Sequence, residues 1–327
     1  MTTIRDIAKN AGVSVGTVSR YLNGTMKVKP ETADRIDQAV RDLDYVRNYS
    51  AATIKTKTSN VVALVFPSMQ SLMFGEIAEA ISNTLSRSGY ILNTFTTGDN
   101  LRREQWAAEK IRELRVAGAV FVTEPIGNKD ISHLHALEQS GIRTVMINRF
   151  YGESEFECIN VDYAGGIGQV MDHLFQRGCR LPGMVCGWPR QNQSVVQAEA
   201  FRRSLLRHGL SPEPEQVKYM YYKEKLIQRK VHELLDMGAD AIIAVSDRSS
   251  VEVNAVLEQA GKRIPEDVAL VSLGNTRFAK ILRMTALDLK LGELGEKAAR
   301  MLLARMEGKP GGGIETIVPE LVVRRTS

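Results

Sequence analysis

Cysteine is scarce in this chain of 327 residues, which has only Cys158, Cys179 and Cys186. Their odd number and wide spacing argue against a disulfide framework or a zinc site and favour a reducing compartment. The sequence also lacks an apolar run long enough to cross a membrane. Its first residues, MTTIRD, lack the apolar core of a signal peptide. We therefore expect a cytoplasmic protein with no membrane partner.

Signatures of catalysis are missing as well. The segment GGIGQV (165–170) lacks the third glycine of a dinucleotide fingerprint and follows VDYA rather than a phosphate-binding turn. His133 and His135 have no further metal ligands close by in the sequence. No nucleophile elbow, phosphate-binding loop or zinc signature occurs. We expect no enzymatic activity, no cofactor and no metal.

Positive charge is concentrated near the amino terminus. The chain carries a net charge of +5, and residues 1–60 contain ten lysines and arginines against six acidic residues. Such an excess suits the neutralisation of DNA phosphates. A hydrophobic content of 43% over this length suits one small domain and one or two larger ones.

Residues 3–23 have the pattern of two short helices joined by a tight turn. Ile4, Ile7, Ala8 and Ala11 recur at helical spacing, and Thr3 is a suitable N-cap. Gly12 can end this helix in the left-handed conformation. A second helix is expected from Ser14, as its cap, to about residue 22. This is a helix-turn-helix pattern, in which the second helix lies in the DNA major groove.

The predicted second helix has two faces. Val18, Tyr21 and Leu22 share the face that can pack on the first helix, while Gly16, Ser19, Arg20 and Asn23 point away. The chemistry of these side chains suggests what each can contact on DNA. Arg20 can bind a guanine or a phosphate, Thr17 and Ser19 can bind phosphates, and Val15 can contact a thymine methyl group. A three-helix packing module that binds no nucleic acid is the alternative. A third helix is expected over 30–44, followed by a polar linker over 47–60.

From residue 61 onward, short apolar strands alternate with helices of 10–15 residues. This alternation predicts parallel sheets covered on both faces, in two successive series. The second series is expected to end with strand 268–274, helix 291–306 and strand 314–323. Ligands of such sheets bind beyond the carboxyl ends of the strands.

The segments TIRDIAKNAGVSVGTVSRYLNG and VKPETADRIDQAVRDLDYVRN resemble the amino-terminal domain of the lactose-repressor/galactose-repressor family of bacterial transcription regulators. The phrases GIRTVMINR, VDYAGG and RIPEDVALVSLG extend the resemblance. It implies an all-α helix-turn-helix head followed by an α/β periplasmic-binding-protein-like body of two doubly wound parallel-sheet lobes. The expected domains are 1–46 for DNA binding, 47–60 as a hinge helix, and 61–327 for effector binding and dimerisation. The expected lobes are about 61–160 with 290–312, and about 161–289 with 313–327.

The resemblance also assigns candidate residues. It implies that Val15, Gly16 and Arg20 read bases, and that Ile54 stands where the family inserts a leucine into the minor groove. The residues expected to contact DNA are Thr3, Ser14, Val15, Gly16, Thr17, Ser19, Arg20, Asn23, Asn48 and Ile54. The residues expected to bind an effector are Phe74, Asn148, Arg149, Trp188, Arg190, Gln197, Ser246, Asp247 and Asn275.

In this effector set, Phe74 and Trp188 would stack on a sugar, and Asp247 is either a ligand contact or the cap of the following helix. Three positions depart from the family: Gln197 replaces an arginine, Ser246 a common asparagine, and Gly274 an aspartate. The segment GNTRFAKIL (274–282) is similar to the trehalose-repressor branch. That likeness implies a phosphorylated or acidic sugar, with Arg149 or Arg190 as its anion partner.

The sequence thus predicts a homodimeric repressor of a carbohydrate-utilisation operon that binds a pseudo-palindromic operator and responds to a sugar or sugar phosphate. One alternative is a regulator of the same fold that a partner protein controls, with a weak or vestigial sugar cleft. Another is a stand-alone solute-binding protein or enzyme of the same α/β fold.

Overall fold

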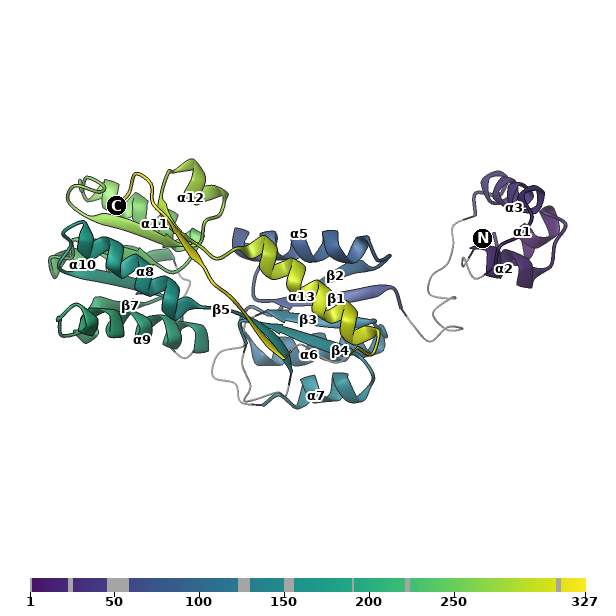
Figure 1. Ribbon diagram of the computed structural model, residues 1–327, viewed down its shortest axis with the longest axis horizontal. Coiled ribbons are helices and arrows are strands. Elements are labelled where there is room, and N and C mark those ends of the chain that lie inside the picture. Colours follow the sequence, from purple (N-terminus) through teal and green to yellow (C-terminus); the bar gives the residue numbers. More distant parts are fainter. Residues whose placement is uncertain are drawn as a thin grey trace. The chain divides into compact units, whose positions relative to one another are not determined.

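The computed structural model describes residues 2–22, 26–45, 59–122, 130–149, 156–189, 191–220, 224–309 and 313–327. The chain forms two compact units, Met1–Ser59 and Asn60–Ser327, and each is described by itself (Figure 1). The predicted hinge segment falls almost wholly on residues outside the described ranges.

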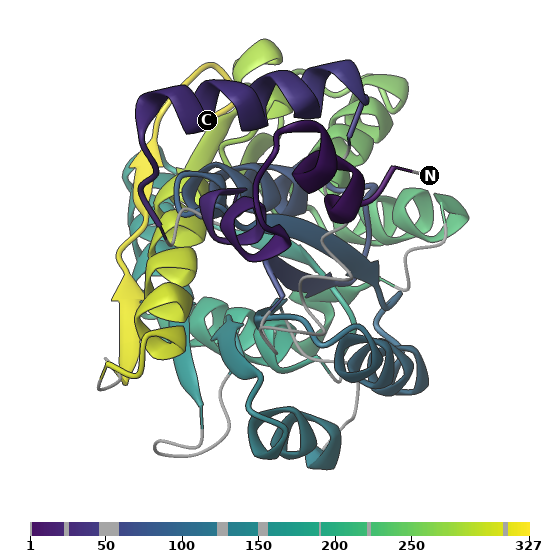
Figure 2. The same ribbon diagram turned by 90° about the vertical axis from the view of Figure 1, so that its right-hand side faces the viewer.

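The first unit contains three helices that pack on one another, drawn in purple in Figure 2. They are α1 (Ile4–Asn10), α2 (Val15–Leu22) and α3 (Pro30–Asp42). The backbone N–H and the hydroxyl of Thr3 both donate to Asp6, over 2.8 and 2.7 Å, which fixes the start of α1. Gly12, with φ of 66°, allows the turn between α1 and α2. The core of this unit consists of Ile7, Ala8, Ala11, Val18, Ile36 and Ala39.

The second unit contains two six-stranded sheets, one in each lobe, and the strand order is the same in both. In the first lobe the order is β2 (Ile91–Thr96), β1 (Val61–Phe66), β3 (Gly118–Val122), β4 (Arg143–Ile147), β5 (Glu157–Val161) and β11 (Ile314–Ile317). In the second lobe it is β7 (Val217–Tyr219), β6 (Pro182–Cys186), β8 (Ala241–Ala244), β9 (Ala269–Leu273), β10 (Thr285–Asp288) and β12 (Glu320–Val322). All neighbouring strands are parallel except β10 and β12. The predicted fold class, a helix-turn-helix unit and an α/β body of two parallel-dominated sheets, is confirmed.

Helices cover both faces of each sheet, because successive side chains of a strand point to opposite sides. In β1, Leu64 packs on the side of α5 (Leu72–Ser86) and α13 (Leu291–Met306), whereas Val65 packs on the side of α6 (Leu101–Glu113) and α7 (Ser132–Gln139). In β6, Met184 faces the side of the first pair of helices in its lobe and Val185 that of the second pair. These pairs are α8 (Tyr163–Gln176) with α9 (Asn192–Arg207), and α10 (Glu224–Asp236) with α11 (Asp247–Gln259).

The chain passes between the lobes three times: after β5, after β10, and between β11 and β12 (Figure 1). The single strand expected over 314–323 is therefore wrong, because β11 pairs with β5 and β12 pairs with β10. Pro319 lies between the two strands and has no N–H to donate to a ladder. The expected lobe boundary at 312/313 is wrong for the same reason, since residues 314–317 belong to the first sheet. Three short elements went unpredicted: η1 (Pro214–Gln216), α12 (Arg277–Ile281) and β10.

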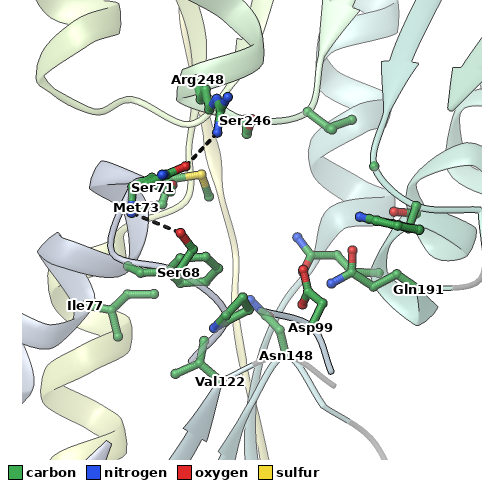
Figure 3. Close-up of a pocket in the computed structure, with 18 of the residues that line it drawn as sticks. Ser68, Ser71, Met73, Ile77, Asp99, Val122, Asn148, Gln191, Ser246 and Arg248 are labelled. Atoms are coloured by element: carbon green, nitrogen blue, oxygen red, sulfur yellow. Dashed lines mark hydrogen bonds between the residues drawn. The ribbon is translucent and has the colours of Figure 1, made fainter. Parts of the chain in front are cut away.

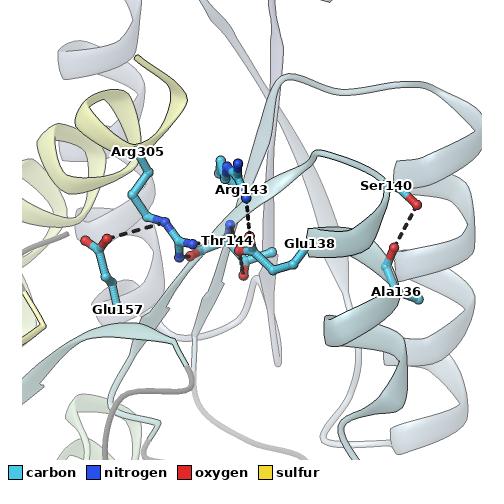
Figure 4. A network of polar contacts seen from close by, with 7 residues as sticks. All are labelled: Ala136, Glu138, Ser140, Arg143, Thr144, Glu157 and Arg305. Carbon is cyan, nitrogen blue, oxygen red and sulfur yellow. Dashed lines mark hydrogen bonds and ion pairs between the residues drawn. The ribbon is translucent and has the colours of Figure 1, made fainter. Parts of the chain in front are cut away.

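An ion-pair network joins opposite faces of the first lobe at the amino end of β4 (Figure 4). Glu138 of α7 accepts from the backbone N–H and the hydroxyl of Thr144, both over 2.7 Å. Arg305 of α13 contacts Glu138 at 3.2 Å and Glu157 of β5 at 3.4 Å, and donates to the carbonyl oxygen of Thr144. The network joins four elements, α7, β4, β5 and α13, at the end of the sheet opposite the cavity.

Two glycines of α13 provide a test of how closely it packs on α5. A Cβ atom at Gly295 would lie 2.7 Å from the carbonyl oxygen of Ile77 and 2.8 Å from the Cβ of Ala80, whereas one at Gly292 would meet nothing within 4 Å. We expect Gly295→Ala to lower the free energy of unfolding by about 1–3 kcal/mol, because both helix backbones must move apart. Gly292→Ala is the matched control and should leave stability unchanged or raise it slightly. Denaturant unfolding measures both, and equal stability of the two variants would contradict the packing.

Candidate functional site

The second helix of the first unit is anchored on one side and exposed on the other. Ser14 caps it by accepting from the backbone N–H of Thr17 over 3.1 Å. Val18 is fully buried, and the hydroxyl of Tyr21 donates to Asp37 of α3 over 2.9 Å. The opposite face of α2 carries Val15, which is 41% exposed, together with Gly16 and Arg20.

The remaining residues predicted to contact DNA fall into three groups. Thr3 and Ser14 are exposed, and Thr17 and Ser19 are half-buried. Arg20 donates from Nε to the carbonyl oxygen of Gly16 over 3.2 Å, so its side chain lies along the exposed face of α2. Asn23, Asn48 and Ile54 lie outside the described residues.

A cavity of about 310 Å³ lies at the carboxyl ends of the strands of both sheets (Figure 3). One wall comes from the segments that follow β1, β2, β3 and β4, and the other from those that follow β6 and β8. This is the position at which doubly wound sheets bind ligands. The lining residues are Pro67, Ser68, Gln70, Ser71, Met73, Phe74, Ile77, Gly98, Asp99, Val122, Asn148, Tyr163, Gly187, Trp188, Gln191, Gln193, Ser194, Gln197, Val245, Ser246, Arg248 and Leu291.

Five of the residues predicted to bind an effector line this cavity: Phe74, Asn148, Trp188, Gln197 and Ser246. Asn148 has a left-handed backbone with φ of 52°, and its Oδ1 accepts from the backbone N–H of Val161 over 2.8 Å. Ser246 caps α11 by accepting from the N–H of Ser249. Arg190 lies outside the described residues.

Arg149 is placed differently from the prediction, since it does not line the cavity. It is 1% exposed, and its guanidinium group makes two hydrogen bonds of 2.8 Å to the carboxylate of Glu104. Glu104 is also hydrogen-bonded to Nε2 of His133 at 2.7 Å. Burial opposes ionisation of Glu104, yet the bonds from His133 and Arg149 hold its pKa below the usual value. A guanidinium group buried this deeply requires its carboxylate partner, so the prediction that Arg149 binds an effector anion is wrong.

Asp247 and Asn275 were also predicted in the effector site, and neither lines the cavity. Asp247 is 1% exposed and joins the lobes: it accepts from the hydroxyl of Ser71 over 3.0 Å and from the N–H of Leu72 over 3.1 Å. It therefore caps α5 of the opposite lobe rather than its own helix. Asn275 uses both ends of its amide, since Nδ2 donates to Asp288 and Oδ1 accepts from Arg324.

Asp99 lines the cavity and was missed in the sequence. It follows β2 with φ of 56°, and its Oδ1 has no hydrogen-bond partner among the described residues. Burial of the carboxyl group, together with the charge of Glu104, raises the pKa of Asp99 to about 6. Nε2 of Gln197, a residue only 2% exposed, likewise has no partner within the described part of the chain. Asp99 was missed because the segment TTGDN (96–100) predicts only a turn before a helix.

The described residues show no group of three or more histidine, cysteine or acidic side chains placed to bind a metal. Within the same residues, no helix is long and apolar enough to cross a bilayer.

Comparison with known proteins matches both units. Residues 3–48 match the bacterial regulatory proteins of the lacI family, and residues 171–327 match a periplasmic binding protein-like domain. The ribose operon repressor of Halalkalibacterium halodurans is 26% identical over 330 residues, which cover 100% of this chain and 97% of the relative. The transcriptional regulator GalR of Escherichia coli is 26% identical and covers 100% of this chain and 96% of its own length.

Solved structures agree in fold. The lac repressor dimer bound to operator and the anti-inducer ONPF has a TM-score of 0.86 at 19% identity, covering 99% of this chain and 98% of that chain. The complex of the regulator CelR with cellobiose has a TM-score of 0.74 at 24% identity, with full coverage of both chains.

A helix-turn-helix unit joined to a two-lobed α/β unit with a cavity between its lobes is the architecture of a DNA-binding transcription regulator on a periplasmic-binding-protein-like body. Residues 3–48 thus form a DNA-binding domain of the lacI type, and residues 171–327 lie in a periplasmic binding protein-like domain. Relatives that match over the whole chain, among them a ribose operon repressor and GalR, are transcription regulators.

The contact between the lobes through Asp247 can be broken by one substitution. Asp247→Ala leaves the hydroxyl of Ser71 and the N–H of Leu72 without an acceptor, so we expect a loss of about 1–3 kcal/mol and faster hydrogen exchange at residues 71–75. Asn100→Ala removes a cap that lies within one lobe, at α6, and should leave exchange at 71–75 unchanged. Unaltered exchange at 71–75 in Asp247→Ala would show that Asp247 does not hold the lobes together.

The raised pKa of Asp99 makes stability depend on pH. The folded chain keeps this proton up to about pH 6, whereas the unfolded value is near 3.8. The stability contribution is therefore complete below pH 4 and is lost as pH rises through 6. We expect Asp99→Asn to stabilise the chain relative to the unsubstituted protein, by about 1 kcal/mol more at pH 8.0 than at pH 5.0. Thermal unfolding at both pH values measures this, with exposed Asp236→Asn as the control for loss of one charge. An equal effect at both pH values would contradict the assignment.

Proposed function

We propose that this chain is a homodimeric repressor of a carbohydrate-utilisation operon and that a small effector in the cavity controls its affinity for a pseudo-palindromic operator. The observation that carries the DNA-binding part is the exposed face of α2, where Val15, Gly16 and Arg20 lie together opposite the buried Val18. Two copies of this helix would read two half-sites, since dimer symmetry imposes operator symmetry.

Gly16 supports the proposal because the fold itself gives no reason for a glycine there. A Cβ at this position would lie 3.8 Å from Ser14 and 3.9 Å from Arg20, which is ordinary contact. Glycine costs a helix about 1 kcal/mol relative to alanine. A close approach of DNA to the helix backbone accounts for this cost.

The composition of the cavity supports a small organic effector. Phe74, Tyr163 and Trp188 supply aromatic rings, while Asn148, Gln193 and Gln197 supply amides. Such a mixture suits a sugar, whose faces are apolar and whose rim carries hydroxyl groups. One relative is a ribose operon repressor and another was solved in complex with cellobiose, so ribose and cellobiose are the first probes. Control by a partner protein stays a prediction.

The proposal places residues 47–60 as a hinge between head and body, with Asn48 and Ile54 in contact with the operator. Arg190 stays a candidate for the effector site.

Removal of the Arg20 guanidinium group tests the DNA-binding part. We expect Arg20→Ala to weaken binding to the DNA upstream of the chain's own gene by about 10- to 100-fold, the size of one lost guanine contact. Electrophoretic mobility shift at two salt concentrations is the measurement, because binding through phosphates weakens steeply with salt. Arg203→Ala, in the body at an exposed position, removes the same charge and should bind like the unsubstituted chain. Undiminished binding by Arg20→Ala would refute the assignment of α2, and no binding at low salt by the unsubstituted chain would refute the regulator itself.

A further inference from the structure

The cavity contains a carboxylate that nothing in the described chain engages. Asp99 stands on the wall of the first lobe, and Figure 3 shows its side chain in the part of the cavity that also holds Asn148 and Gln191. Its Oδ1 lacks a partner among the described residues, as does Nε2 of the buried Gln197 on the opposite wall. The two walls thus contain a hydrogen-bond acceptor and a donor that are both shielded from solvent and lack a partner within the described residues.

Two basic side chains at or behind the cavity wall, Arg248 and Arg149, are already paired with carboxylates. Among the described lining residues, Arg248 is the single lysine or arginine. It donates from Nε to Glu252 over 2.8 Å and from Nη1 to Gln70 over 2.9 Å. Arg149 is buried against Glu104 behind the wall. A phosphate or carboxylate entering the cavity therefore meets Asp99 without an uncommitted cation in the described wall.

Two helix amino termini at the cavity are also occupied, whereas α9, which begins beside the lining residue Gln191, has no side-chain cap. Helix dipoles favour anions at these ends, and uncapped N–H groups would offer a phosphate site. The carboxylate of Asp247 caps α5, and the hydroxyl of Ser246 caps α11. The first of these caps brings a further negative charge close to the cavity wall.

We propose that Asp99 makes the cavity selective for a neutral, hydroxyl-bearing ligand and against the phosphorylated or carboxylated form of the same ligand. This selectivity rests on the proposed function. It favours a sugar over a sugar phosphate, the two classes of effector that the sequence left open. A neutral ligand donates a hydroxyl proton to the free oxygen of Asp99 and accepts from the amide of Gln197. An acidic ligand brings a second negative charge into a half-buried site, where repulsion is stronger than in water.

Matched ligands test this selectivity. The probes are ribose, glucose, galactose and cellobiose, each compared with its phosphate or its carboxylate form, in thermal-shift titrations of the full chain at pH 8.0. We expect a neutral sugar to half-saturate the shift at a concentration at least about tenfold lower than its acidic form. Asp99→Asn should reduce this ratio to about three or less, because it removes the charge and keeps a hydrogen-bonding group. Asparagine also tolerates the left-handed backbone at this position, so the variant should fold.

Two further variants sharpen the outcome. Asp236→Asn removes an exposed charge outside the cavity and should leave the ratio unchanged. Arg190→Gln should also leave it unchanged. Tighter binding of an acidic form that disappears in Arg190→Gln would overturn the proposal and identify Arg190 as an anion partner. An unchanged ratio in Asp99→Asn would overturn it as well. If no sugar of either form shifts the melting temperature, the sugar effector fails together with this inference, whereas the DNA-binding test decides the regulator separately.

Discussion

The hydrogen bonds between Asp247 and the amino end of α5, with the bond from Arg248 to Gln70, join the two lobes of the body. The carboxylate is buried, and its two donors, Ser71 and Leu72, belong to the other lobe. If the lobes separate, hydrogen bonds to water must replace those between the carboxylate and the amino end of α5. The net value of such a contact is on the order of 1–3 kcal/mol. It is therefore large enough to define one state of the body and small enough for a ligand to outweigh.

The three passages of the chain between the lobes restrict the motion that remains. They lie after β5, after β10 and between β11 and β12, and the first is held by the bond from Val161 to the side chain of Asn148. At the far end of the first sheet, Glu138 and Arg305 bind strands and helices into a rigid layer. Any change in the angle between the lobes must therefore act through these crossing segments.

The sequence predicted what local pattern determines. The periodicity of Ile4, Ile7 and Ala8, and the glycine at position 12, suffice for α1 and its turn, because both depend on neighbours within four residues. Alternation of strands and helices likewise placed Trp188 on a loop, and Phe74 and Gln197 near the starts of helices, beyond the carboxyl ends of strands and from there in the cavity. Parallel topology makes these loops meet whatever their sequence.

What the sequence did not predict depends on distant partners. Arg149 is withdrawn from the cavity by Glu104, 45 positions away, and Asp247 is engaged by Ser71, 176 positions away. The split of the last strand follows from pairing with residues near 158 and 288, and Pro319 between the two strands was a local sign of it. Asp99 was missed because a carboxylate in a glycine-containing turn is usually solvated, and its burial arises only when the second lobe faces it.

A ligand in this cavity contacts both lobes, so its binding is coupled to the arrangement of the lobes. A ligand shifts a conformational equilibrium only by its difference in affinity for the two states. Reversing a population from 1:99 to 99:1 requires about 5.5 kcal/mol. The contact through Asp247 forms with or without a ligand, so it sets the starting equilibrium and supplies none of this difference. The difference must come from ligand contacts that exist only when the walls face each other, such as a ring held between Phe74 and Trp188, or a hydroxyl that reaches both Asp99 and Gln197. The body can therefore act as a switch only if a single small molecule contacts side chains on both walls at once.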